Sequence, residues 1–379
     1  MQNKQNDIIA PKTASPKNYS VAVVATMSAG KSTLLNAFMA DDLLPTSNMA
    51  CTSTVYSIDD NDKADNFSGR YITGSTTSPW QNVDRKKLSQ WNTQKVDKIE
   101  LKGNLPVIFN TDENTCITLL DTPGPNNSTN LQHARITNDI ITKHDYSCIV
   151  CVLNSTVLAT YDEKKLLIEL QHQQEKRRNF SIYFVLNKID ELDIEKNELP
   201  CDVIEKLNFF LADIGFAAPL VIPTSASMSL NIRRLFKNSE PISEEDLKHL
   251  RPLVKNFDPT LPVFRCPYSR NRQKALINQM QQFWRQRRFY RQCLHDEKKL
   301  ARSWLALRGS PAFVSPRQIL IDDTFFSLDH LIKIDFLCGV AFLEKTLELD
   351  MLSHLGQSPS TYQLKKRIKK KQMQEKKIQ

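Results

Sequence analysis

Three short groups of residues have the types and spacing for phosphate and base chemistry. Residues 28–33 read Ser-Ala-Gly-Lys-Ser-Thr, residues 121–124 read Asp-Thr-Pro-Gly, and residues 187–190 read Asn-Lys-Ile-Asp. Backbone N–H groups and a lysine attract phosphate oxygens, while hydroxyl and carboxylate oxygens suit Mg²⁺. A carboxylate also accepts hydrogen bonds from the donors of a base. Together the three groups predict a site for a nucleotide and a magnesium ion.

The first group stands where a phosphate-binding loop requires it. Residues 21–25 are an apolar run typical of a strand buried on both faces, and a helical pattern follows the loop. Lys31 would reach the outer phosphates and the Ser32 hydroxyl would bind Mg²⁺. The full pattern G-x-x-x-x-G-K-[ST] has Ala25 at its first glycine, so a strand–turn–helix with a chance Gly-Lys-Ser is the alternative.

The second group follows a strand predicted over residues 115–120. Asp121 would hold Mg²⁺ through water, and the Gly124 amide would bond the γ-phosphate. A plain turn after a strand is the alternative. In a switch protein the loop after the first helix also supplies a threonine, for which Thr52 is the first choice and Thr54 the next. The alternative there is a connecting loop with incidental threonines.

The third group follows a buried strand predicted over residues 181–186. Asp190 can accept from two donors of guanine that adenine lacks, so it would select the base. The Lys188 stem would lie along the base, and Asn187 would brace the loop. A Ser-Ala turn at Ser225 and Ala226, after the next strand, would back the guanine ring.

The elements that carry these groups predict an α/β fold with a doubly wound, mostly parallel sheet and the ligand at the carboxyl ends of its strands. Residues 96–102 alternate in the manner of an edge strand. Residues 202–214 predict a helix capped by Asp202 and ended by Gly215. We expect a flexible arm over 1–18, a nucleotide domain over 19–355 with insertions or elaborations at 60–110 and 230–330, and a basic tail over 356–379.

Charge and composition restrict the class of protein. The chain has 379 residues and a formal charge of +9, and eight of its Lys and Arg residues lie between 365 and 377. The body is therefore nearly neutral. The eight cysteines are scattered, which is typical of reduced thiols, and Cys148 and Cys151 would point to opposite faces of a strand. No signal peptide or 20-residue apolar run is present, so we expect a cytoplasmic protein, with peripheral membrane attachment left open.

The sequence resembles the dynamin superfamily of large GTPases, in particular the bacterial dynamin-like proteins. The motifs that carry the resemblance lie at 27–37, 43–45 with Thr52, 119–126, 187–190 and 337–347, the last being similar to the helix that closes the dynamin GTPase domain. The resemblance implies hydrolysis of GTP, pairing of two GTPase domains across their nucleotide faces, and membrane remodelling. It implies catalytic roles for Ser28, Lys31 and Thr52, and contacts with GTP or Mg²⁺ for Ser28, Ala29, Gly30, Lys31, Ser32, Thr33, Thr52, Asp121, Gly124, Asn187, Lys188, Asp190, Ser225 and Ala226.

The sequence departs from the family pattern in two ways. Met27 stands where eukaryotic dynamins have a glutamine that places the attacking water, and no glutamine follows residues 121–124, so we expect slow turnover by the monomer. About 24 residues follow Leu355, where the family continues into a helical stalk. The resemblance therefore covers the GTPase domain alone.

Three functional hypotheses remain open from the sequence. The first is a GTPase stimulated by pairing, with its basic tail on an anionic membrane surface. The second is a non-assembling, GTP-dependent interaction module with little turnover. The third is a GTPase associated with RNA or the ribosome, although a nucleic-acid partner is the least favoured. The basic, aromatic stretch at 270–308 is read first as an amphipathic helix with solvated charges.

Overall fold

The computed structural model describes residues 17–46, 54–61, 63–94, 96–105, 115–122, 142, 146–177, 180–193, 199–237, 318–321, 324–327, 335 and 338–354. The predicted arm, except its last two residues, most of 230–330, and the tail lie outside these ranges, so those predictions stay untested. Among the described residues, no helix has the length and hydropathy to cross a bilayer.

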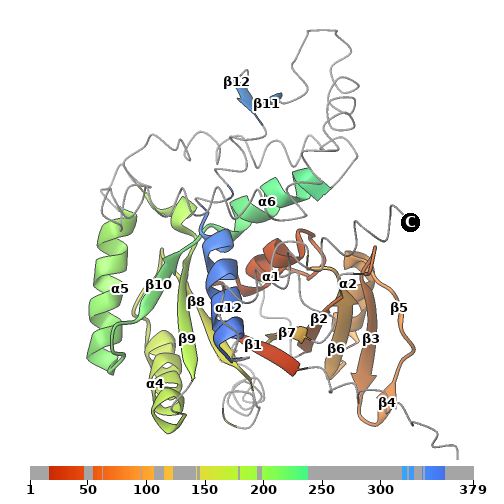
Figure 1. Cartoon of the computed structure of the whole chain (residues 1–379), viewed down its shortest axis with the longest axis horizontal. Helices are drawn as coiled ribbons and strands as arrows, with labels where there is room; N and C mark the ends of the chain where they lie inside the picture. The colour runs from red at the N-terminus through yellow and green to blue at the C-terminus, as the bar shows by residue number, and fades with distance from the viewer. Residues whose placement is uncertain are drawn as a thin grey trace, which may run out of the picture.

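The centre of the molecule is a ten-stranded mixed sheet (Figure 1). Its order is β10-β9-β8-β1-β7-β2-β6-β3-β4, and β5 also pairs with β3. The five strands from β10 to β7 are parallel, whereas β2 runs antiparallel to β7. The strands are β1 (Lys17–Ala25), β2 (Val55–Asp60), β3 (Ser68–Thr73), β4 (Thr76–Thr77), β5 (Gln81–Asn82), β6 (Lys98–Gly103), β7 (Thr115–Asp121), β8 (Cys148–Asn154), β9 (Ser181–Asn187) and β10 (Leu220–Pro223). A separate hairpin joins β11 (Gln318–Ile321) and β12 (Thr324–Ser327). The predicted α/β class with a mostly parallel sheet is confirmed.

The central strands are apolar on both faces because helices cover both. On β1, Ala22 and Val24 belong to one core cluster, while Val21 and Val23 belong to the other. Cys151 and Cys148 of β8 divide in the same way, which confirms that they point to opposite faces. Within the described part of the chain, no group of three His, Cys, Asp or Glu residues is arranged to hold a metal ion.

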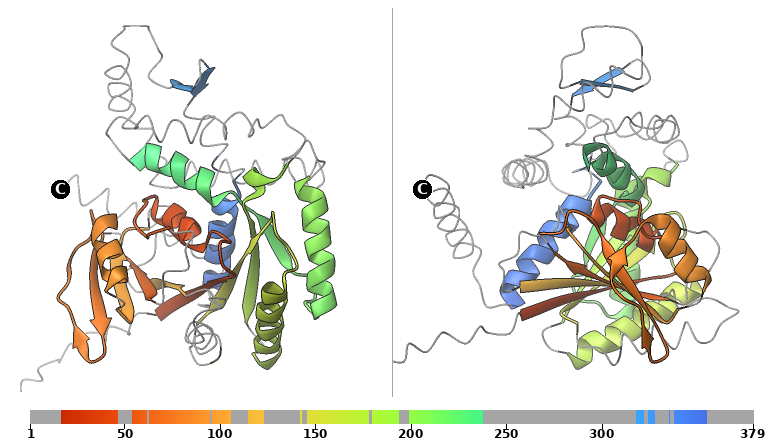
Figure 2. Two further views of the ribbon diagram at one scale, coloured as in Figure 1. Left: turned by 180° about the vertical axis from the view of Figure 1, so that it is seen from behind. Right: turned by 90° about the vertical axis from the view of Figure 1, so that its right-hand side faces the viewer.

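Helices form a layer on each side of the sheet (Figures 1 and 2). Apolar side chains of α1 and α12 pack on one face, those of α4 and α5 pack on the other, and α6 contributes to both clusters. The helices are α1 (Lys31–Met39), α2 (Arg85–Thr93), α4 (Tyr161–Lys176), α5 (Pro200–Ile214), α6 (Ala226–Lys237) and α12 (Val340–His354), with a short 3₁₀ helix, η1 (Ile189–Glu191).

Residues 60–105 extend the sheet beyond the parallel strands. The prediction of an edge strand at residues 96–102 is wrong, because β6 pairs with β2 on one side and β3 on the other. Its alternation arises from one buried face and one polar face, where Glu100 pairs with Arg70 at 2.7 Å. Alternation reports which face is solvated, and it does not report a strand's place in the sheet. Helix α2 packs on this extension through buried Leu88 and Trp91.

The start predicted for α5 is also wrong. The helix begins at Pro200 after Leu199, two residues before Asp202, and Leu199 makes no side-chain capping bond. Proline at the first helical position lacks the N–H that would otherwise need a cap, so the acidic cap is not required. The end is confirmed: Gly215 has φ +112° and closes the helix in the left-handed conformation.

Helix α12 brings the end of the described chain back onto the sheet. Asp350 accepts hydrogen bonds from the hydroxyls of Tyr19, Ser181 and Tyr183 at 2.5, 2.8 and 2.7 Å, which ties α12 to β1 and β9. At its start, Gly339 has φ +76°, and an added Cβ would lie 1.9 Å from the Pro223 carbonyl oxygen. This position therefore requires glycine, and α12 is fixed against the end of β10.

Candidate nucleotide-binding site

The phosphate-loop residues lie between the carboxyl end of β1 and the start of α1. Ser28 and Gly30 both have positive φ, 60° and 87°, so the backbone turns sharply before the helix. Gly30 is the residue before α1, and an added Cβ there would lie 2.3 Å from Asn187 Nδ2. Any larger residue at Gly30 would both strain the backbone and displace Asn187.

Lys31 and Asp121 meet at one point of the site. Lys31 Nζ is in ion-pair contact with Asp121 Oδ1, and Asp121 ends β7 beside β1. The two side chains are 13% and 7% exposed. Burial lowers the pKa of Lys31 to about 7, because the charged ammonium loses its hydration there. The predicted phosphate-binding cation and the predicted metal-binding carboxylate are thus brought together.

Asn187 connects three predicted parts of the site. Its Nδ2 donates to the Ala29 carbonyl at 2.9 Å, and its Oδ1 accepts from the Ala226 amide at 3.0 Å. The side chain is buried. These two hydrogen bonds join the phosphate loop to the Ser-Ala turn through one side chain. Ser225 is fully buried and its amide donates to the Cys338 carbonyl at 2.9 Å, which joins the turn to α12.

Asp190 carries an acceptor with no partner in the described part of the chain. Its Oδ1 atom is buried and makes no hydrogen bond there. Burial raises the pKa of Asp190, while a hydrogen bond with the Ser225 side chain opposes the rise. A buried carboxylate oxygen without a donor is costly unless a ligand supplies one. Lys188, in the left-handed conformation, precedes it and lies 3.1 Å from Glu191.

The remaining predicted residues divide into two groups. Ser32 and Thr33 lie in the first turn of α1 and are half-buried. Thr52 and Gly124 lie outside the described residues. Thr54 is among the described residues and is 3% exposed. Its hydroxyl donates a hydrogen bond to the Val96 carbonyl at 2.8 Å, so this hydroxyl already has a structural partner.

Residues 21–189, which contain β1, β7 and β9 with their motifs, match the family model for the dynamin family. These residues form a dynamin-family GTPase domain. No curated protein matches the chain.

The solved structures that resemble this chain fall into two groups. Two are bacterial dynamins from an oligomerised pair described as sensing and tethering membranes, with 17% and 15% identity over 76% of this chain and TM-scores of 0.44 and 0.42. The chain spans 48% and 46% of their lengths, about half in each case. A third is an Era variant from Aquifex aeolicus bound to GDP·AlF₄⁻, with 21% identity over 58% of this chain and 55% of that one, and a TM-score of 0.34.

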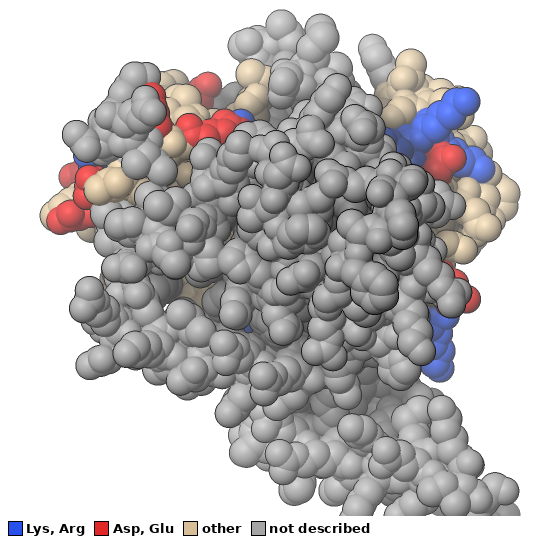
Figure 3. Space-filling model, turned by 90° about the horizontal axis from the view of Figure 1, so that it is seen from above, with Lys and Arg blue, Asp and Glu red and all other residues tan. Residues whose placement is uncertain are grey.

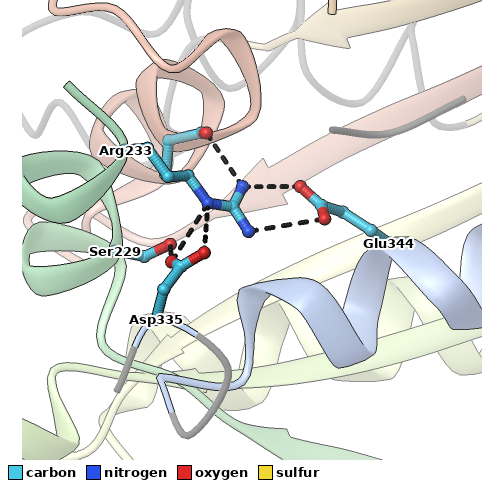
Figure 4. Close-up of polar contacts among 5 residues, drawn as sticks. Ser229, Arg233, Asp335 and Glu344 are labelled. Carbon is cyan, nitrogen blue, oxygen red and sulfur yellow. Dashed lines mark hydrogen bonds and ion pairs between the residues drawn. The ribbon is translucent and has the colours of Figure 1, made fainter. Parts of the chain in front are cut away.

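A buried arginine in contact with α1 was not predicted. Arg233 of α6 is 0% exposed, and its Nε donates to Asp335 while its Nη1 atom donates to Glu344 at 2.6 Å (Figure 4). The same Nη1 also donates to the Ala37 carbonyl of α1 at 3.0 Å. The arginine therefore connects α6 and α12 to the helix that begins at Lys31. Its carboxylate partners lie 102 and 111 residues away in sequence, so no local pattern signals the cluster.

Proposed function

We propose that this domain binds GTP with Mg²⁺ and hydrolyses it to GDP and phosphate. The observation that carries the proposal is the buried Asp190 Oδ1, which lacks a hydrogen-bond partner among the described residues. The donors of guanine would satisfy it. Adenine would leave it unpaired at a cost of about 1–3 kcal/mol. The Asn187 bonds connect this acceptor to the phosphate loop.

The phosphate end fits a magnesium nucleotide by the chemistry of its groups. Lys31 and Ser32 are the first residues of α1, and Asp121 ends β7 in contact with Lys31. Hydroxyl and carboxylate oxygens are the ligands that Mg²⁺ prefers. The ion would neutralise charge on the phosphates when bound. Thr52 is proposed as its further ligand and Gly124 as a γ-phosphate contact. Ser28, Ala29, Gly30 and Thr33 would offer backbone N–H groups to phosphate.

Base binding would use the rest of the site. We assign the Lys188 stem to one face of guanine, and the Ser225–Ala226 turn to the ring edge. Because Ser225 is hydrogen-bonded to Asp190, the turn also holds the carboxylate in place. Asn187 would support both the phosphate loop and the base-binding turn, because its side-chain amide is hydrogen-bonded to Ala29 and to Ala226.

Hydrolysis is proposed to be slow in the monomer and faster when two domains pair. Met27 is 53% exposed and supplies no polar group to orient water. Val157 follows the carboxyl end of β8 and is 55% exposed, while Tyr161 begins α4 and is 82% exposed. Since β8 lies beside β1, these apolar side chains belong to the nucleotide edge of the sheet. Apolar surface there supports pairing of two copies across this edge.

The membrane role of this chain is proposed from its family alone. The domain has the family's motifs, and the bacterial dynamins to which it is similar are described as sensing and tethering membranes. The basic tail would supply attraction to anionic lipid of about 1 kcal/mol per charge.

The test is GTP turnover per chain measured at rising protein concentration. We expect turnover per chain to rise in the wild type and to stay low in Tyr161→Ser, because the substitution removes apolar area from the pairing edge. Phe209→Ser is the matched control, since Phe209 is 70% exposed but lies on α5. Turnover that stays flat in the wild type would support the non-assembling module. Binding of GTP without any turnover would refute the proposal that the domain hydrolyses GTP.

A further inference from the structure

The base-binding turn, residues 224–226, supports the segment that carries Asp190. The Ile189 amide, next to the carboxylate, donates a hydrogen bond to the Thr224 carbonyl at 3.3 Å. Asp190 itself is hydrogen-bonded with the Ser225 side chain. The position of the proposed guanine acceptor therefore depends on the position of this turn.

Ser225 joins the base-binding turn to α6. Its Oγ accepts a hydrogen bond from the Met228 amide at 3.4 Å, as the side chain of a helix-capping residue does. Its carbonyl accepts from the Ser229 amide at 3.1 Å. A hydroxyl oxygen that accepts from Met228 still has its own proton to donate, and the Asp190 carboxylate can accept it. A shift of the first turn of α6 would therefore move Ser225 and, with it, Asp190.

The first turn of α6 is held by a buried carboxylate. Ser229 Oγ donates to Asp335 Oδ1 at 2.5 Å, and both residues are 0% exposed (Figure 4). Arg233 Nε lies 3.1 Å from the same oxygen and 3.0 Å from Oδ2. Ser229 and Arg233 are four residues apart, so they lie on the same side of the helix. Asp335 thus binds two successive turns of α6 through one carboxylate.

The backbone at the start of α12 contacts the other side of the turn. The Cys338 carbonyl accepts a hydrogen bond from the Ser225 amide at 2.9 Å. A Cβ added at Gly339 would lie 1.9 Å from the Pro223 carbonyl oxygen, so the two backbones are in close contact there. Ser225 is therefore held in two ways, through α6 by Asp335 and directly by the backbone at Cys338.

We propose that Asp335 and Ser229 are positioning residues for guanine recognition. The inference rests on the proposed function, because Asp190 accepts from the base only if the domain binds GTP. The hydrogen bond between Ser229 and Asp335 fixes the first turn of α6, which fixes Ser225 and so the direction of the Asp190 carboxylate. A carboxylate that is held in one direction before the base arrives loses less conformational entropy on binding. It also favours a base whose donors lie in matching positions.

The Asp335 contacts differ from the exposed charges of the molecule. Seen from above, Lys and Arg side chains gather with acidic ones at the right-hand edge, the side where Figure 1 draws α2 and β3 (Figure 3). Salt screens exposed charges of this kind, but it screens the pair of Asp335 and Arg233 little, because both side chains are 0% exposed. An effect of this cluster on base preference should therefore be the same at low and high salt.

The experiment measures the affinities of the full chain for GDP and for inosine diphosphate (IDP), with Mg²⁺. IDP lacks only the exocyclic amine of guanine, one of the two donors that Asp190 would accept. Because both nucleotides bind the folded state, their affinity ratio does not depend on the folded fraction, and a merely structural loss leaves it unchanged. We expect the wild type to bind GDP about tenfold to a hundredfold more tightly than IDP, as a hydrogen bond to a charged group allows.

Ser229→Ala is the test, and Ser227→Ala is its matched control, because Ser227 is exposed in the same turn of α6. We expect Ser229→Ala to lower the GDP-to-IDP ratio by about threefold or more, and Ser227→Ala to leave it unchanged. Asp335→Asn keeps an oxygen for the Ser229 hydroxyl but removes the negative charge beside Arg233. It should therefore lower the denaturant midpoint more than Ser229→Ala does, and lower the ratio less.

The outcomes separate the inference from the proposed function. An unchanged GDP-to-IDP ratio in Ser229→Ala would overturn the positioning role and leave the GTPase intact. An equal fall of the ratio in Ser227→Ala would overturn it as well, because loss of either hydroxyl would then have the same effect. A fall that disappears at high salt would contradict the buried origin of the effect. Absence of GDP binding by the wild type would refute the proposed function and, with it, this inference.

Discussion

Two arginines act near the carboxyl end of α1, in opposite surroundings. Arg233 reaches the Ala37 carbonyl from inside the protein, with no exposed surface and two carboxylate partners. Arg85 reaches Asp42 from the surface, with its side chain 43% exposed. Both join α1 or the chain after it to another helix. Their different exposure means that they contribute to stability in different ways.

Solvent explains the difference between the two arginines. Water solvates Arg85 whether or not it pairs with Asp42, so the pair adds little to stability and mainly selects a position. Arg233 has no access to water, and removing it would leave Asp335 and Glu344 buried without the guanidinium. The buried cluster therefore holds the helices together, whereas the exposed contact mainly fixes the position of the chain that follows α1.

The largest effect is expected for Arg233→Met. The change should lower the free energy of unfolding by about 3–5 kcal/mol, because it leaves two buried carboxylates without their cation. Chemical denaturation, followed by fluorescence and by circular dichroism for helix content, measures this free energy. Arg234→Met, one residue along and half-buried, is the control and should cost clearly less. Equal losses in the two variants would contradict the importance given to the buried cluster.

A buried carboxylate on α4 should show a pH-dependent effect. Glu163 is 1% exposed, burial raises its pKa to about 7, and its Oε1 has no hydrogen-bond partner in the described ranges. The folded pKa is above the unfolded value of about 4.3, so the folded state binds more protons between these values and stability falls as pH rises through this window. Glu163→Gln removes that loss.

The prediction for Glu163→Gln is therefore a difference that grows with pH. The variant and the wild type should be about equally stable near pH 4, and the variant should be more stable by about 3–4 kcal/mol at pH 8. Denaturant unfolding across this range measures it. Asp162→Asn, on the exposed neighbour in the same turn, controls for loss of a charge at the helix start. A constant difference between Glu163→Gln and the wild type across the pH range would sink this account.

The smallest effect on stability is expected for Arg85→Ala. An exposed ion pair contributes about 0.2–1 kcal/mol, so the free energy of unfolding should fall by less than about 1 kcal/mol. Added salt should reduce even this difference, because exposed charges are screened. Thermal unfolding at low and high salt measures both. If Arg85→Ala lowered the free energy of unfolding as much as Arg233→Met, the exposed and the buried arginine would contribute equally to stability, which would contradict this comparison.

Local patterns in the sequence predicted the parts of the fold that depend on neighbouring residues. The buried strand at Val21–Ala25 and the helix opened by Lys31 follow from apolar periodicity and from small residues in the loop. The position of Asn187 follows from its motif at the end of a buried strand. The sequence predicted only that Asn187 would brace the loop, and its hydrogen bond to Ala29, 158 residues away, is visible only in the fold.

Contacts without a motif could not be predicted in the same way. The place of β6 inside the sheet depends on pairing with β3, which the alternation of residues 96–102 does not encode. Asp335 and Glu344 pair with Arg233 from outside the family match. Arg85 and Asp42 are 43 residues apart, and each taken alone reads as an ordinary exposed charge. Only the folded arrangement shows that they meet.

The central claim is that Asp190 selects guanine at a phosphate site formed by Lys31. Calorimetric titration with non-hydrolysable GTP and ATP analogues, in Mg²⁺, tests it most directly. We predict binding of the guanine analogue only, loss of this preference in Asp190→Asn, and loss of all binding in Lys31→Ala, with Glu191→Gln as the neighbouring control. Equal binding of both analogues by the wild type, or unchanged selectivity in Asp190→Asn, would contradict the account.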